Sequence, residues 1–340
     1  MQPVFRLPPD WKVTPALTPL SEVVDPFQEL LGVADLQKRN AGIAYQGTPQ
    51  QRPVRFAVLD TGCDLNHNDL KSQLVDAADF TGSRFGPEDR NDHGTWCCGA
   101  IAAAANDFGV RGIAYEARLL SAKVLGDNGS GDDASIANGL RWAYVKGADV
   151  FSLSLGGGRM SESLRRMFLE VSQQPGKFIF CASGNDGGRV NYPAAWPETI
   201  AVGAVDKSGQ LTKFTSRGPQ LDILAPGVEI LSTISGNKHG TMTGTSMATP
   251  IAAAIGGLVW AQATSSGHSE RLDTKDEMIE LLRSRGNCSG EVACQYPVID
   301  PRMLATAFVP DAPVDGGDGP DEVHVFIGGV CYRSTHFERA

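Results

Sequence analysis

The sequence lacks the features expected of nucleic-acid-binding and membrane-spanning proteins. Its net charge is −9, and no Lys/Arg cluster longer than a few residues occurs, so a basic face for nucleic acid is not expected. No run of roughly 18 apolar residues is present that would cross a bilayer as a helix. We therefore expect no nucleic-acid partner and no membrane partner.

The sequence also lacks the pattern of a secretory signal and an even number of cysteines. The first residues, MQPVFRLPPDWKVTP, contain no positively charged segment followed by an apolar one. Of the seven cysteines, Cys97 and Cys98 are adjacent in a predicted buried helix, so we expect free thiols that pack as small hydrophobic side chains. Only Cys288 and Cys294 have a spacing suited to a disulfide. These observations favour a reducing, cytoplasmic location.

Short apolar segments alternate with amphipathic ones along the middle of the chain. We expect strands at 54–60, 117–125, 148–156, 177–184 and 198–205, and helices at 26–39, 94–105, 133–147 and 162–174. Buried strands that alternate with helices predict a parallel sheet covered on both faces. The predicted fold class is therefore α/β, with three α/β/α layers around a mostly parallel central sheet.

The two ends of the chain differ from this pattern. Residues 1–24 are proline-rich and unpatterned, which predicts an N-terminal extension. Residues 25–286 form the predicted main domain, and residues 287–340 a C-terminal extension. Within that extension, residues 311–322, DAPVDGGDGPDE, have the composition of a linker, and a strand-like tail, VHVFIGGVCYR, follows.

Four polar side chains lie where predicted strands and helices meet loops. Asp60 ends a strand in VLDTG, His93 precedes a helix in NDHGTW, and Asn185 follows a strand in CASGND. Ser246 lies between a glycine turn and an apolar helix in GTSMATP. Helix capping would explain a single Asp or Ser. Ligands bind beyond the carboxyl ends of parallel strands, however, and Asp60, Ser154, Asn185 and the loop after Val124 lie at such ends.

Together these residue types meet the needs of nucleophilic attack on an amide. The Ser246 hydroxyl must lose its proton to a base, which His93 can be, and Asp60 can hold the imidazole in one tautomer. The oxygen of the tetrahedral intermediate needs donors, which the Asn185 amide and the Ser246 backbone N–H can supply. The chain order Asp, His, Ser is one of three orders known for this geometry.

Longer motifs carry a family resemblance from about residue 26 to 285. VLDTGCDLNHNDL, DHGTWCCGAIAA, SLSLGG, ASGND, YPAAWPETIAVGAV and GTSMATP resemble the subtilisin-like serine proteases, peptidase family S8. VLDTGCD and KVLGDNGSG look most like the intracellular subtilisins. The resemblance implies a serine endopeptidase that hydrolyses peptide bonds through an acyl-enzyme. It also implies Asp60, His93 and Ser246 as the catalytic triad and Asn185 as the oxyanion donor.

The resemblance also implies where a polypeptide substrate binds. An extended peptide is held by adding a strand to exposed edges, and two segments match the family's edges: Gly129, Ser130 and Gly131, and Ser154, Leu155 and Gly156. The pocket for the P1 side chain, which precedes the scissile bond, would be lined by Ala182, Ser183, Gly184 and Gly157. Such a pocket suits medium or large apolar P1 side chains, whereas Asp186 and Asn191 near its mouth favour polar or basic ones. The sequence leaves both open.

In the family, a loop after the helix of the catalytic histidine binds calcium. The matching positions give the side chains of Asp69 and Asn106 and the carbonyl oxygens of Ala104, Phe108 and Val110. Oxygen ligands with a carboxylate among them suit Ca²⁺ and not zinc. The resemblance therefore implies calcium as a stabilising cofactor, and a hydrogen-bonded loop without metal is the alternative.

The N-terminal extension is too short to fold as a prodomain. Intracellular members instead carry a short segment with a proline that blocks the cleft, and FRLPPDW at residues 5–11 is similar. We expect this segment to act as an inhibitory propeptide that lies across the active site until it is cleaved, and a disordered tail is the alternative. By analogy with intracellular relatives, a homodimer is possible.

One departure from the family follows the HGT motif, where Trp96, Cys97 and Cys98 replace His-Val-Ala. We expect Trp96 to lie beside the cleft and narrow it. Two other functions stay open: a non-catalytic pseudoprotease that serves as a binding scaffold, and a transamidating relative that cyclises peptides. The intact set of four polar residues argues against the first, and the lack of a long insertion over the cleft argues against the second.

Overall fold

The structure is a computed structural model, and it describes residues 4–7, 13–19, 21–40, 52–158, 161–265, 272–287, 295–307, 323–327 and 330–334. Cys288, Cys294, the linker at 311–322 and residues 8–11 of the predicted inhibitory segment lie outside the described residues. The chain divides into two compact units, residues 1–308 and 309–340. Within the described residues, no helix is both long and apolar enough to cross a membrane.

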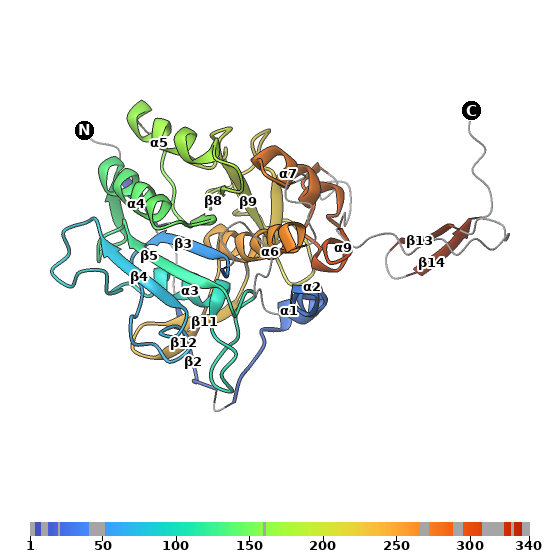
Figure 1. The fold of residues 1–340 in the computed structure, drawn as a ribbon, viewed down its shortest axis with the longest axis horizontal. Coiled ribbons are helices and arrows are strands. Elements are labelled where there is room, and N and C mark those ends of the chain that lie inside the picture. The colour runs from blue at the N-terminus through green and yellow to red at the C-terminus, as the bar shows by residue number, and fades with distance from the viewer. Residues whose placement is uncertain are drawn as a thin grey trace. The chain divides into compact units, whose positions relative to one another are not determined.

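The first unit is built on a seven-stranded sheet in which every neighbouring pair is parallel (Figure 1). Its order is β10-β9-β8-β7-β3-β5-β4. The strands are β3 (Arg55–Asp60), β4 (Leu74–Asp79), β5 (Arg118–Lys123), β7 (Val150–Leu153), β8 (Phe178–Ala182), β9 (Ile200–Val205) and β10 (Ile223–Pro226). The five predicted strands are confirmed, whereas β4 and β10 were not predicted.

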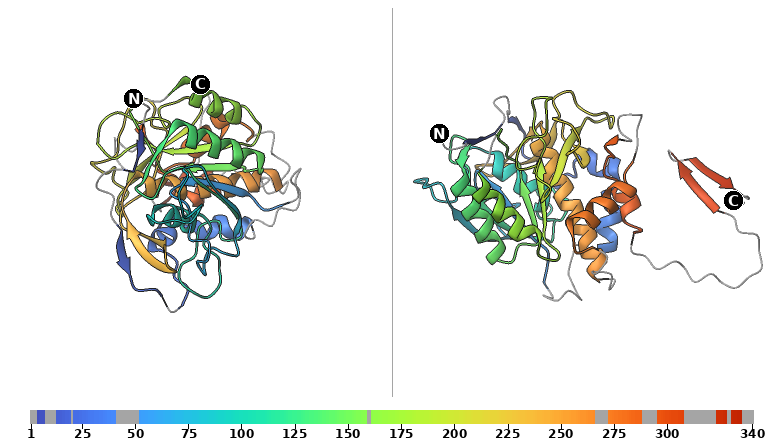
Figure 2. Two further views of the ribbon diagram at one scale, coloured as in Figure 1. Left: turned by 90° about the vertical axis from the view of Figure 1, so that its left-hand side faces the viewer. Right: turned by 90° about the horizontal axis from the view of Figure 1, so that it is seen from above.

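Helices cover both faces of this sheet (Figure 2). Successive residues of a strand point to opposite faces: Phe56 and Val58 of β3 join one buried cluster, and Ala57 and Leu59 join the other. The first cluster includes α3 (His93–Ala102), α6 (Thr245–Ser265) and α7 (Lys275–Ser284); the second includes α4 (Asp133–Val145) and α5 (Glu162–Ser172). The predicted three-layer α/β/α fold is confirmed.

The predicted helix at 26–39 is two helices, α1 (Pro26–Leu31) and α2 (Val33–Asn40). Gly32 ends α1 in the left-handed conformation, with φ of 66°, and a Cβ there would lie 2.3 Å from the Cγ atom of Arg302. Only glycine avoids both the backbone strain and the clash. Arg302 lies 270 residues further along the chain, so the local pattern did not reveal this contact.

The N-terminal extension contributes two short strands to the first unit. β1 (Val4–Arg6) pairs antiparallel with β6 (Ser130–Asp132), and β2 (Thr14–Ala16) pairs antiparallel with β12 (Lys238–Met242). The other neighbour of β12 is β11 (Ile230–Ile234). The described part of this extension is therefore paired with the main domain at both ends.

At the other end of the chain, residues 295–307 pack within the first unit. Val298 bridges Leu224 of β10, and α9 (Pro301–Leu304) buries Leu304. The boundary between the two units thus falls later than the predicted boundary at residue 287. In the second unit, the predicted strand-like tail is a hairpin of β13 (Val323–Ile327) and β14 (Val330–Ser334).

Candidate active site

Asp60 and His93 form a buried pair at the carboxyl end of β3. Asp60 is the last residue of that strand, and His93 is the first residue of α3. The His93 Nδ1 atom lies 2.8 Å from the Asp60 Oδ1 atom, which also accepts a hydrogen bond of 2.7 Å from the Thr61 backbone N–H. Both side chains are at most 1% exposed. This contact fixes the ring orientation of His93.

Asp89 braces this pair, and sequence reasoning missed it. Its carboxylate accepts hydrogen bonds from the Thr61 hydroxyl at 2.9 Å and from the Thr95 hydroxyl at 2.7 Å. It thereby ties the turn after β3 to the first turn of α3. Burial raises the pKa of Asp89, and hydrogen bonds from Thr95 lower it in part. The available signal in the sequence was Asp89 four residues before His93, together with Thr95 two residues after His93.

The close approach of these two segments requires a glycine after His93. A Cβ on Gly94 would lie 2.2 Å from the Gly62 carbonyl oxygen, well inside van der Waals contact. The Gly94 backbone N–H instead donates to the Thr61 hydroxyl at 2.9 Å. The HGT motif therefore has a packing reason as well as a chemical one.

Ser246 lies in the first turn of α6, a helix that is buried along nearly its whole length. Pro250 has no N–H to donate to the Ser246 carbonyl one turn earlier, and that oxygen accepts a 2.7 Å hydrogen bond from the Ser154 hydroxyl instead. The Ser246 hydroxyl donates in turn to the Ser154 carbonyl at 3.3 Å. The two serines thus join the start of α6 to the residue that follows β7.

Cys97 brings the His93 turn and the Ser246 turn together. It lies one turn after His93 on α3, and its Sγ atom is 4.0 Å from His93 Nδ1 and 3.9 Å from the Ser246 carbonyl oxygen. Burial raises the pKa of this thiol well above its ordinary value, so it packs as a neutral side chain. The prediction of buried free thiols at Cys97 and Cys98 is confirmed.

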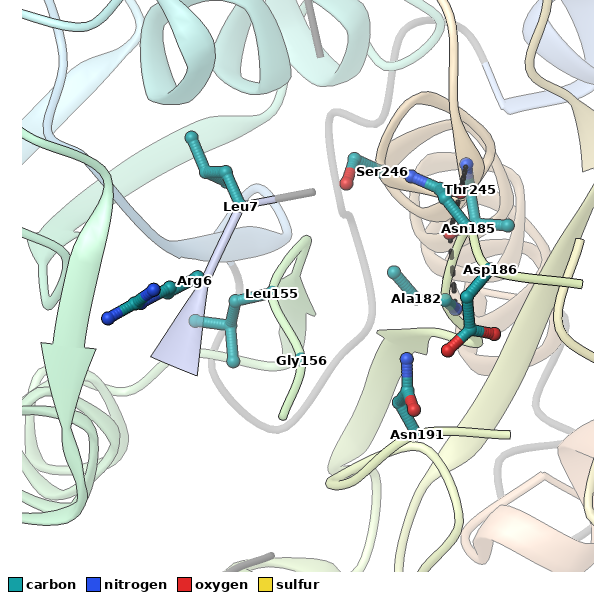
Figure 3. Close-up of a pocket in the computed structure, with 11 residues that line it drawn as sticks. Arg6, Leu7, Leu155, Gly156, Ala182, Asn185, Asp186, Asn191, Thr245 and Ser246 are labelled. Atoms are coloured by element: carbon teal, nitrogen blue, oxygen red, sulfur yellow. Dashed lines mark hydrogen bonds between the residues drawn. The ribbon is translucent and has the colours of Figure 1, made fainter. Parts of the chain in front are cut away.

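Asn185 is oriented by the residue before Ser246. Its Oδ1 atom accepts hydrogen bonds of 2.8 Å from both the backbone N–H and the hydroxyl of Thr245. With the oxygen held in this way, the Nδ2 donor is directed toward the cavity, and Figure 3 shows it pointing toward Ser246. A fixed amide donor beside a serine hydroxyl is the arrangement that meets a developing oxyanion.

A cavity of about 420 Å³ opens beside Ser246 (Figure 3). Four of the residues predicted to bind substrate line it, together with two from the N-terminal segment, and the full lining is Arg6, Leu7, Leu155, Gly156, Ala182, Gly184, Asn185, Asp186, Asn191, Thr245 and Ser246. Ser183 is not among them, because it is fully buried, with its backbone bonded to Val202 and Asn191. Gly129, Ser130, Gly131 and Ser154 of the two predicted edges are not part of this lining either.

The N-terminal segment pairs with both predicted substrate edges. The Arg6 backbone N–H donates to the Gly156 carbonyl at 3.4 Å, and the Leu7 N–H donates to the Gly129 carbonyl at 3.1 Å. In the same register Phe5 lies opposite Gly131 and is fully buried. Residues 5–7 therefore form the middle strand between the two edges, and their backbone makes the contacts expected of a peptide.

The predicted calcium loop is closed by hydrogen bonds of the protein. The Asp69 Oδ2 atom accepts from His239 Nε2 at 2.8 Å and from the Val110 backbone N–H at 3.0 Å. The Oδ1 atom accepts from the Asn106 amide at 3.2 Å, and Ala104 N–H donates to the Asp69 carbonyl at 2.8 Å. Asp69 and His239 are both fully buried. Sequence reasoning missed His239, which lies far along the chain on β12.

Trp96 does not narrow the cleft. Its side chain is fully buried, and its Nε1–H donates to the Gly240 carbonyl of β12 at 3.1 Å. It packs in the core because it lies on the side of α3 that faces β11 and β12, where Ser232 also donates to the Trp96 carbonyl. The expectation for this residue was therefore wrong.

Comparison with known proteins gives consistent matches. Residues 52–284 match the model of the subtilase family of serine peptidases. The chain is 38% identical over 241 residues to the major intracellular serine protease of Bacillus subtilis (strain 168), covering 68% of this chain and 75% of that protein. It is 39% identical to an intracellular serine protease of Paenibacillus polymyxa (69% and 74%). Against Subtilisin E of Bacillus subtilis it is 42% identical, over 61% of this chain and 55% of that protein.

Proposed function

Because the chain belongs to the subtilase family and is a serine endopeptidase, we propose that Asp60, His93 and Ser246 are its catalytic triad, with Asn185 as the oxyanion donor. The single observation that carries the proposal is the buried 2.8 Å contact between Asp60 and His93, joined through Cys97 to the turn of Ser246. Polypeptides are the substrates that this chemistry implies.

In the proposed reaction, the Ser246 hydroxyl gives up its hydrogen bond to the Ser154 carbonyl. Its oxygen then attacks the carbonyl carbon of the scissile bond while His93 accepts its proton. Asp60 holds the Nδ1–H and stabilises the imidazolium that forms. The oxyanion is met by the Asn185 amide and the Ser246 backbone N–H. His93 then protonates the leaving amine, and water hydrolyses the acyl-enzyme by the same proton transfers. The freed Ser154 carbonyl becomes an acceptor for the substrate backbone.

A serine-reactive phosphonate probe followed by peptide mapping tests this function. The expected result is a single adduct on Ser246, together with hydrolysis of an unstructured polypeptide. Product masses that are 18 Da above those of cyclised products distinguish hydrolysis from transamidation. A folded protein that neither reacts with the probe nor cleaves any peptide, even when Leu7→Asp has released the N-terminal segment, would instead be a pseudoprotease scaffold, and the proposal would be wrong.

We also propose that the N-terminal segment inhibits the enzyme by binding as a substrate does. The proposal is supported by the backbone bonds of Arg6 and Leu7 to the two edges and by the burial of Phe5. The next residues in the sequence are Pro8 and Pro9, which have no N–H to donate to the Ser154 carbonyl. A bound segment with poor scissile geometry occludes the site until it is removed.

A matched pair of leucines in the extension tests this inhibition. Leu7 is 5% exposed and Leu17 is 95% exposed. We expect Leu7→Asp to raise the initial rate on a short peptide by about tenfold or more. Burying an unpaired carboxylate at this position costs several kcal/mol, so the segment should dissociate from the site. Leu17→Asp serves as the control and should match the unmodified chain. Equal initial rates for all three proteins would refute the proposal.

The predicted calcium ligands do not fit the ion as they are arranged here. The three groups that meet the Asp69 carboxylate are hydrogen-bond donors, and calcium at Oδ1 would require Asn106 to present its amide oxygen there instead of its NH2 group. Calcium at these residues stays a prediction, and no step of the reaction depends on it. We propose that the Asp69–His239 pair, instead of a calcium ion, holds the loop at 104–110 in position.

Removing Asp69 should therefore destabilise the protein even without calcium. We expect Asp69→Ala to lower the free energy of unfolding in EDTA by about 3–5 kcal/mol, because a buried imidazole loses its partner. Asp76→Ala is the matched control, since Asp76 pairs with Lys146 on the surface and such pairs contribute about 0–1 kcal/mol. If the unmodified chain needs calcium for its stability in urea, the ion and not His239 holds the loop.

Two finer predictions complete the proposal. The names of two relatives contain the word intracellular, and we propose a cytoplasmic location for this chain. A homodimer also stays a prediction, which light scattering coupled to size-exclusion chromatography would test.

A further inference from the structure

We propose that the cavity beside Ser246 selects a Lys or Arg side chain at P1, through the Asp186 carboxylate and the Asn191 side-chain amide. This rests on the proposed function, because it assigns the cavity to the residue before the scissile bond. It goes beyond that function by naming the class of peptide bond that the enzyme prefers.

The cavity has apolar walls and a polar end. Leu155 and Gly156 form one side, and Ala182 forms part of the other. Figure 3 shows Asp186 and Asn191 next to each other, opposite Leu155 and Gly156. An aliphatic stem between apolar walls with a charged tip at a polar end matches the chemistry of Lys and Arg side chains.

Asn191 closes the end of the cavity. A Cβ added to Gly156 would lie 3.5 Å from the Cβ atom of Asn191, and one added to Gly184 would lie 2.3 Å from its Nδ2 atom. The Asn191 side chain therefore reaches from one wall to the other. A large aromatic P1 side chain would collide with this amide, whereas a narrow aliphatic one can pass beside it.

Asp186 supplies an anion. The Ser216 hydroxyl donates to its Oδ1 atom at 2.5 Å, and the Gly188 N–H donates to the same atom at 2.9 Å. The hydrogen bond from Ser216 is the main cause that holds the pKa of Asp186 below its usual value, and donors of Gly188 and Asn191 add to it. The carboxylate is therefore ionised at neutral pH, and its charge is stabilised by neutral donors.

No cation of the main domain balances this charge among the described residues that line the cavity. The one cation there is Arg6, which belongs to the N-terminal segment, and Figure 3 shows its side chain pointing away from Asp186. Arg217, which follows Ser216, donates to the carbonyls of Thr212, Lys213 and Thr215. A cationic substrate side chain would supply the missing charge, whereas an acidic one would be repelled.

Tetrapeptide substrates that differ only in P1 test the proposal on the full chain carrying Leu7→Asp, which is expected to release the N-terminal segment from this cavity, and the further substitutions are made in that background. With Lys, Arg, Leu, Phe and Glu at P1, we expect kcat/KM to be highest for Lys and Arg and lowest for Glu. The isosteric Asp186→Asn should lower the ratio of Lys to Leu kcat/KM by up to about fivefold, the range for an exposed charge pair. Asn191→Gly should raise kcat/KM for Phe relative to Leu, because it opens the end of the cavity.

The matched control is Asp206→Asn. Asp206 also accepts through Oδ1 from a serine hydroxyl, that of Ser208 at 2.7 Å, but it does not line this cavity. The Lys to Leu ratio should be unchanged in this variant. A preference of the Leu7→Asp chain for Leu or Phe, or an equal ratio after Asp186→Asn and Asp206→Asn in that chain, would overturn the proposal. If the phosphonate probe labels Ser246 and cleavage is indifferent to P1 charge, this inference alone fails; without labelling or cleavage, the proposed function fails.

Discussion

Ser246→Ala is expected to lower kcat by about 10⁶-fold, the loss known for removal of the same serine in subtilisin. The methyl group of alanine cannot attack the scissile carbon, and no neighbouring group replaces the hydroxyl. Cys97, the nearest thiol, is held in its neutral form by burial and is therefore a poor nucleophile. Single-turnover rates on a fluorogenic peptide measure the effect.

The Ser246→Ala variant should lose this kcat while it keeps the native fold. The Ser246 hydroxyl makes a 3.3 Å hydrogen bond to the Ser154 carbonyl, and alanine suits the start of a buried helix. Ser232→Ala is a suitable control, because it removes another buried hydroxyl, which donates to the Trp96 carbonyl at 2.8 Å. That control should keep nearly full activity. If Ser246→Ala retains more than about 1% of kcat, Ser246 is not the nucleophile.

The central sheet was predictable because its strands are short apolar runs separated by amphipathic helices. Residues buried on both faces leave a strong local signal, as in β3 and β8. β11 and β12 leave a weaker one, since KHGTM in β12 is half polar, and β2, which comes from the far end of the chain, is one of the two neighbours of β12. Such long-range pairing has no periodicity that a local reading would detect.

The site was predictable to the extent that its residues lie at strand ends and helix starts. Asp60 and His93 follow this rule, and the structure brings them into contact. His239 does not, because it lies inside a strand and its role arises only when β12 packs against the loop of Asp69. Ser183 was misassigned for a related reason: neighbouring residues of an extended segment face opposite ways, so Ala182 and Gly184 line the cavity while Ser183 is buried.

Asp60→Asn is expected to lower kcat by about 10⁴-fold, the range known for this replacement in proteases with the same triad. The amide that replaces the carboxylate can donate to His93 Nδ1, which leaves the proton on Nε2 and removes the acceptor that Ser246 needs. It also removes the negative charge that stabilises the imidazolium. The side-chain volume hardly changes, so the 2.8 Å contact can persist with reversed polarity.

Asp89→Asn distinguishes this electrostatic role from simple bracing. Asp89 is buried nearby and accepts from Thr61 and Thr95, but it does not bond to His93 in the described contacts. We expect this variant to lose stability, measured as a lower urea midpoint, with a far smaller loss of kcat than Asp60→Asn. Were both variants to lose kcat equally and in proportion to their stability, Asp60 would act only by holding the turn after β3. A kcat loss confined to Asp60→Asn at unchanged stability requires its charge to act on the imidazole of His93.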